Sequence, residues 1–198
     1  MCSLIEAKAD GIRPETLLVF QNDKSELAAL FLLGFEGART AEGRTLKASD
    51  TAWEKDLYRH PRRQGLGRED EYVMQHDIYG LGACLLEIGL WCTFVAYQDA
   101  TASKPMPSIV YPRCDDAASK HELNRATVLK SSLVSFAERE LTSHIGDKYA
   151  KVAVSCLTCL DTSNPDVIDE SEFTDDDNVG VGVRYFEKIL LKLSNVSV

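Results

Sequence analysis

The chain lacks an excess of positive charge. Among its 198 residues, 22 are Lys or Arg and 31 are Asp or Glu, which gives a formal net charge of -9. A protein with this charge offers no broad positive field for phosphates, so binding to nucleic acid is not expected. The first ten residues contain no sustained apolar stretch and already include acids. No secretory signal peptide is therefore predicted, and a cytoplasmic location is expected.

The chain also lacks a convincing membrane span. Residues 78–97 form a long apolar run, but Glu87 lies near its middle and the run contains three glycines. A carboxylate at the centre of a bilayer is costly, and no excess of Lys or Arg flanks either end. We interpret this run as a helix buried in a globular domain, for which a composition that is 44% apolar supplies enough core.

Few side chains have the spacing of a metal or nucleophile site. The only C-x-x-C pair, Cys156 and Cys159, falls in a helical pattern without two further ligands, so buried reduced thiols are predicted, with redox or metal use as the alternative. The acidic loop 161–178 fits an EF-hand at some positions but fails at Pro165 and Asp166. Four separated histidines give no hydrolytic triad: His60, His76, His121 and His144.

Apolar spacing predicts a mainly α fold with a small β-hairpin, an α+β class. Residues 17–20 and 29–33 read as two short buried strands joined by a polar turn. A helix beginning near residue 75 is apolar on nearly every face and should be buried on nearly every side, with Met74, Cys84 and Cys92 in the core.

Further helices are predicted downstream, after a proline-containing stretch at 100–114 that should hold no regular element. Residues 119–145 carry an apolar stripe with fourfold spacing, which Gly146 ends. Asp147 is expected to cap the next helix. A last amphipathic helix is predicted at 184–193.

A local basic cluster stands out in this acidic chain. It lies in a long segment, 40–74, that is rich in Arg, Gly and acids. Pairing with the chain's own acids is favoured over a phosphate contact. The cluster consists of Arg59, Arg62, Arg63 and Arg68.

In order along the chain, five segments resemble landmarks of the carboxyl-terminal lobe of a protein kinase. Residues 11–18 (GIRPETLL) resemble the catalytic loop D-L-K-P-E-N-I-L, and 34–39 (GFEGAR) resemble D-F-G-L-A-R. Residues 58–62 (YRHPR) resemble the Y-x-x-P-E end of the activation segment. Residues 77–82 (DIYGLG) resemble the start of the central helix, which 85–91 (LLEIGLW) continue.

The amino-acid sequences of these segments are most similar to those of kinase-like domains of filamentous fungi, which often follow a helical prion-inhibition or cell-death module. On this resemblance, 10–39 hold the catalytic and metal-binding loops, 40–74 the activation-segment-like loop, and 75–198 a helical subdomain. The resemblance implies that Asp77 is a structural anchor, which caps the central helix and bonds the catalytic-loop backbone.

Departures from the kinase pattern fall on the residues that perform catalysis. The resemblance places Gly11 where the catalytic aspartate stands, Thr16 at the magnesium-binding asparagine and Gly34 at the D-F-G aspartate. Without these groups, phosphoryl transfer loses its base and its metal ligands. Glu36 would replace the lost carboxylate only after a backbone rearrangement. No metal is therefore expected.

The resemblance also implies that the amino-terminal lobe, with its glycine-rich loop and lysine, is absent from this chain. We expect a catalytically inactive kinase-like module that acts through contact with another protein, with self-association also open. The alternative is a fragment of a protein kinase domain, in which case ATP and magnesium would be its ligands.

Overall fold

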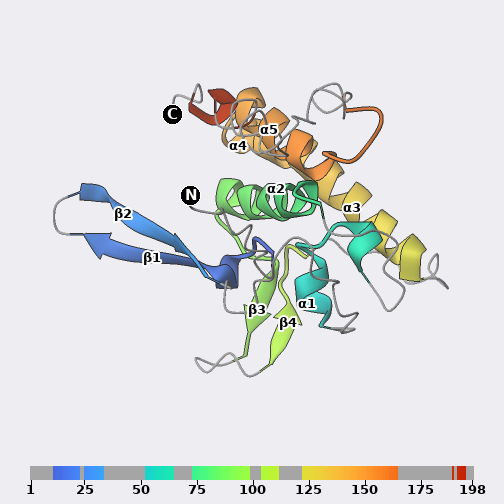
Figure 1. Cartoon of the computed structure of the whole chain (residues 1–198), viewed down its shortest axis with the longest axis horizontal. Coiled ribbons are helices and arrows are strands. Elements are labelled where there is room, and N and C mark those ends of the chain that lie inside the picture. Colours follow the sequence, from blue (N-terminus) through green and yellow to red (C-terminus); the bar gives the residue numbers. More distant parts are fainter. Residues whose placement is uncertain are drawn as a thin grey trace, which may run out of the picture.

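The structure, a computed structural model, describes residues 11–22, 25–33, 52–64, 73–98, 104–111, 122–164, 189 and 191–194. It is mainly helical with two separate two-stranded antiparallel sheets, which confirms the α+β class. Figure 1 shows the helix α2 at the centre, with α4 and α5 above it, α3 running down at its right, and the short elements α1, β3 and β4 below.

The central helix α2 spans Gln75–Leu90 and is buried along most of its length, as its sequence predicted. It can approach α5 (Asp147–Leu157) closely because Gly82 has no side chain: a Cβ there would lie 2.8 Å from the Cβ of Cys156. Two expectations at its ends are wrong. Met74 is substantially exposed, and the helix stops before Trp91, whose φ of 50° is left-handed.

The upper layer begins with a helix that runs from α3 (Glu122–Phe136) through the π-helical turn η4 (Ala137–Leu141) to α4 (Thr142–His144). The predicted stripe is confirmed, because Leu129, Leu133, Ala137 and Leu141 are all buried. The helix ends before Gly146, whose φ of 102° favours glycine. Asp147 is not the N-cap of α5 but its first helical residue, since Gly146 occupies the cap position.

Part of the segment interpreted as a long loop is ordered structure that contributes to the core. It contains the short helix α1 (Trp53–Asp56) and the 3-10 turn η2 (Pro61–Arg63). Between them, Leu57 and Tyr58 are buried in the same apolar cluster as α2. Their burial depends on contacts with residues distant in sequence, so local composition did not reveal it.

The proline-containing stretch also holds a strand, contrary to expectation. The strand β4 (Pro105–Pro107) pairs antiparallel with β3 (Val95–Tyr97), with Met106 opposite Ala96. Alternate residues of a strand direct their backbone nitrogens to the same side. The nitrogens of Pro105 and Pro107 therefore point away from β3, and their missing N–H groups remove no hydrogen bond between the two strands.

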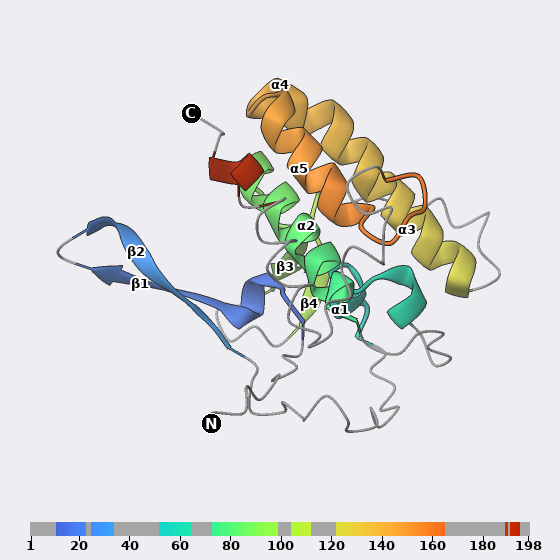
Figure 2. The same cartoon turned by 45° about the horizontal axis from the view of Figure 1, so that its top comes forward.

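The first hairpin has the predicted strands but not the predicted burial. The 3-10 turn η1 (Pro14–Thr16) leads into β1 (Leu17–Asn22), which pairs with β2 (Ser25–Leu32). The hairpin projects from one side of the body in both Figure 1 and Figure 2. Most of its apolar side chains with described burial are exposed, so the prediction of two buried strands is wrong.

Several predictions fall outside the described residues. They concern Gly34, Glu36, Arg68, His121, the acidic loop beyond Asn164, and most of the last predicted helix. Within that helix, 191–194 are helical and Ile189 is buried. In the part of the chain that the structure describes, no helix combines the length and apolarity needed to cross a membrane.

Candidate functional site

The loop from Gly11 to Thr16, which resembles a catalytic loop, is held by bonds within itself. The hydroxyl of Thr16 lies 2.9 Å from the carbonyl oxygen of Arg13 and 3.2 Å from that of Gly11, and it accepts a bond from the backbone N–H of Arg13. Thr16 is buried. Its oxygen therefore organises the turn instead of facing a ligand.

Gly11 at the start of this loop has a φ of 92°. This is a conformation that side-chain-bearing residues adopt only with strain. A Cβ at this position would meet no atom within 4 Å. The backbone, and not crowding, is what favours glycine here.

The loop packs directly on α2. A Cβ at Gly80 would lie 2.5 Å from the carbonyl oxygen of Ile12 and 3.0 Å from that of Tyr58, so two distant segments meet the helix at this glycine. Asp77 lies three residues earlier, in the first turn of α2. It is not the N-cap residue, because the cap position belongs to Met74. The anchoring role of Asp77 stays a prediction.

A buried carboxylate joins the end of the activation-segment-like stretch to the far end of α2. Glu87 Oε1 accepts hydrogen bonds from the hydroxyl of Tyr58 at 3.0 Å and from the backbone N–H of Phe94 at 2.6 Å. The Thr93 hydroxyl lies 3.3 Å away. Burial raises the pKa of Glu87 above its ordinary value, although these hydrogen bonds oppose the shift. Burial, together with the nearby Glu87 carboxylate, also raises the pKa of Tyr58.

This contact was not anticipated from the sequence. Tyr58 and Glu87 are separated by 29 residues, and each was recognised only as a position in its own motif. A buried charge in an otherwise apolar helix was the available signal, since such a group requires hydrogen-bond donors from another element.

A second buried polar group lies where η2 meets α2. The Nδ1 atom of His60 accepts a hydrogen bond from the backbone N–H of Arg62 at 3.4 Å, so its Nε2 carries the proton. The ring packs edge-on against Tyr79 and beside His76. Burial, with smaller effects from Lys130, His76 and Arg62, lowers the pKa of His60 to about 3.

His60 should therefore make the fold less stable in acid. Its pKa falls from an ordinary 6.5 to about 3 on folding, so the unfolded chain binds a proton that the folded chain excludes. The stabilisation is complete above pH 6.5 and is lost as the pH falls towards 3. Urea unfolding across this range should show a shallower decline for His60→Gln than for the parent. An unchanged slope would contradict a buried neutral ring, and His144→Gln, at an exposed histidine, is the control.

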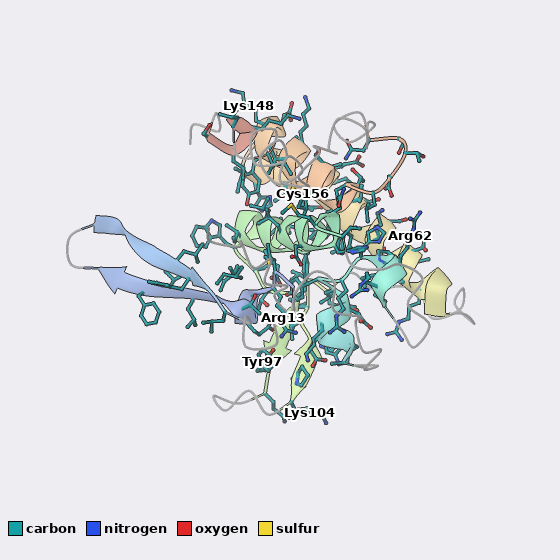
Figure 3. The ribbon with its side chains drawn as sticks, viewed as in Figure 1. Arg13, Arg62, Tyr97, Lys104, Lys148 and Cys156 are labelled. Atoms are coloured by element: carbon teal, nitrogen blue, oxygen red, sulfur yellow. The ribbon has the colours of Figure 1, made fainter. Side chains whose placement is uncertain are left out.

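The cysteines in the described segments are free thiols, and three of the four are buried. Cys156 belongs to α5, and its side chain lies against α2 at Gly82 (Figure 3). Burial raises its pKa above the ordinary value. Cys159 donates to the carbonyl oxygen of Gln75 at 3.1 Å. Burial of both thiols, with the raised pKa of Cys156, makes them poor nucleophiles.

The basic cluster is at least partly paired with the chain's own acids. Arg59 lies 3.5 Å from Asp56, and Gln64 ties the same turn together by donating to the carbonyl oxygens of both residues at 2.8 Å. Figure 3 shows Arg13 and Tyr97 below α2, and the hydroxyl of Tyr97 donates to Glu15 at 2.9 Å.

In the described loop from Gly11 to Thr16, neither of these two residues offers a side-chain ligand to a magnesium-nucleotide complex. Gly11 has no side chain, and Thr16 directs its hydroxyl into its own turn. Among the described side chains, no group of three or more His, Cys, Asp or Glu is placed to hold a metal ion.

Comparison with known proteins identifies no relative: no family model, curated protein or solved structure matches this chain.

Proposed function

We propose that this chain is a catalytically inactive kinase-like module with the fold of the carboxyl-terminal lobe, acting through protein contacts in fungal signalling. The observation that carries the proposal is the closed loop from Gly11 to Thr16. A kinase uses this loop to present a carboxylate to the substrate hydroxyl and an amide to magnesium. Here the first position has no side chain, and the second uses its hydroxyl to close the loop.

The contacts around α2 support a kinase-like arrangement. Two of the segments that carry the resemblance meet on α2, which carries the others: Ile12 from the loop lies against Gly80, and Tyr58 from the activation-segment-like stretch contacts Gly80 and Glu87. Chance resemblance of separate short motifs would not require those motifs to meet. Their meeting is consistent with one inherited framework whose catalytic groups have been replaced.

The test is a thermal melt of the full chain with magnesium and ATP, with ATP and EDTA as the matched control. Magnesium-ATP should leave the midpoint of the melt unmoved, because the proposed module has no nucleotide site. The assay is sensitive enough to detect one, since a ligand of the folded state present at 100 times its Kd adds about 2.7 kcal/mol to stability. Phosphotransfer should stay undetectable, even in a variant carrying both Gly11→Asp and Gly34→Asp. A magnesium-dependent rise would instead favour the kinase-fragment alternative.

A further inference from the structure

The molecule exposes two apolar surfaces for which no role has been described. The hairpin surface consists of six side chains on β1, on β2 and just after β2: Leu18, Val19, Phe20, Leu30, Phe31 and Leu33. The helix-end surface consists of Ile88 and Trp91, at the carboxyl-terminal end of α2. The carboxyl-terminal end of α2 lies on the side of the molecule from which the hairpin projects (Figures 1 and 2).

The hairpin surface is apolar on both faces of its sheet. The register sets Val19 opposite Leu30 on one face, and these residues are 66% and 63% exposed. On the other face, the rings of Phe20 and Phe31 meet edge-on at 5.4 Å and remain 56% and 52% exposed. A two-stranded hairpin is marginally stable by itself in water, and no third described strand joins it. Such a sheet requires cover from outside.

The composition of the strands indicates that the cover is apolar. β1 has the sequence LLVFQN, without a charge, and β2 has SELAALFL, whose one charge is Glu26. Neither strand carries the Lys or Pro residues that protect solvent-facing edges. In a chain with a net charge of -9, this hairpin, whose strands carry a single charge, is suited to contact another apolar surface.

The helix-end surface is a suitable counterpart. Trp91 is 91% exposed at a left-handed position that fixes its backbone, and Ile88, one turn earlier, is 55% exposed. Tryptophan is the residue most often found to dominate binding at interfaces. Strands of six and eight residues give the arm a reach of about 20 Å, enough to lie across a helix end on a neighbouring molecule.

We propose that two copies of this chain form a two-fold dimer in which the hairpin surface of each copy covers the helix-end surface of the other. Because both surfaces belong to one chain, this exchange buries both at once. Each contact is limited by the smaller helix-end surface, whose two side chains present roughly 250 Å² of apolar area. Two such contacts bury on the order of 500 Å² per copy, or about 1,000 Å² in total, which is the lower end of the range for a specific interface. The dimer does not depend on the proposed function.

Sedimentation velocity of the full chain over a wide concentration range provides the test. The parent should sediment as a dimer. Phe20→Glu on the hairpin and Trp91→Lys at the helix end should each weaken the dimer about thirtyfold or more, as loss of a central interface residue does. Ile109→Lys, at an equally exposed residue on neither surface, should leave the dimer intact. Far-ultraviolet circular dichroism and thermal melts should show that the variants stay folded.

Mixing the Phe20→Glu and Trp91→Lys variants provides a test that misfolding cannot imitate. A mixed dimer keeps one unaltered contact and places Glu opposite Lys in the other, so the mixture should recover the dimer mass that each variant alone has lost. A monomeric parent, growth beyond the dimer, dissociation by Ile109→Lys, or a mixture that stays monomeric would overturn the proposal. Dimerisation of Trp91→Lys by itself would also overturn it, because the hairpins would then be pairing with each other.

Discussion

Replacing Gly80 with alanine should destabilise the protein by about 3 kcal/mol, although alanine is intrinsically the better helix former by about 1 kcal/mol. The added Cβ would lie 2.5 Å from the carbonyl oxygen of Ile12 and 3.0 Å from that of Tyr58. Both are backbone atoms, so neither can rotate away as the end of a flexible side chain could. The variant must displace either the loop or the segment that carries Tyr58.

Urea unfolding followed by circular dichroism measures this loss, and Gly146→Ala is the matched control. Gly146 also has no side chain, but a Cβ there meets nothing within 4 Å, and the only penalty is its φ of 102°. With ψ at 167°, Gly146 lies in a region almost exclusive to glycine, so the control should lose on the order of 2 kcal/mol from backbone strain alone. If Gly80→Ala were as stable as the parent, the loop would not be seated on α2.

Replacing Glu87 with alanine should cost about 3 kcal/mol, because it leaves the buried hydroxyl of Tyr58 and the N–H of Phe94 without their acceptor. Glu87→Gln keeps a carbonyl oxygen at the same place and should lose less. The exposed residue Glu138 supplies the control, since Glu138→Gln should change the free energy of unfolding by no more than about 0.5 kcal/mol. Equal, negligible effects of all three changes would contradict the buried network.

The pH dependence of the Glu87→Gln comparison has a definite sign. Burial raises the pKa of Glu87 in the folded state. Between the unfolded and folded pKa values, Glu87 is therefore protonated to a greater extent in the folded chain than in the unfolded chain. The contribution of Glu87 to stability is then fully present below the unfolded pKa and is lost as pH rises through the folded pKa. The parent should gain stability over Glu87→Gln as pH falls. A difference independent of pH would show that Glu87 does not titrate as a buried group.

Much of the fold follows from local pattern. The apolar run at 78–97 predicted the buried helix that became α2. The fourfold stripe through Leu129, Leu133 and Leu141 predicted the long helix through α3, because a helix satisfies its own backbone and requires only one consistent apolar face. The two strands of the first hairpin were also found by their composition. For the proposed site, the assignment of Gly11 and Thr16 to a catalytic-loop-like segment rests on the resemblance alone and stays a prediction.

The errors have a common cause, which is that burial depends on what lies opposite a residue. Leu57 and Tyr58 were assigned to a loop because their neighbours in sequence are polar, yet α2 covers them. Val19 and Phe20 were expected to be buried because they are apolar, yet no described element covers them. Pro105 and Pro107 were expected to interrupt regular structure, yet they flank a paired residue in an edge strand.

The sequence by itself therefore determined the helices, the hairpin strands and the negative charge, since each of these is a property of residues close together in the chain. The tertiary structure decided that the Thr16 hydroxyl closes its own turn, that Tyr58 reaches Glu87 across 29 residues, and that the hairpin stands free with its apolar faces exposed. These outcomes depend on which distant segments pack together, and the free energy of that packing is shared among contacts that no local pattern encodes.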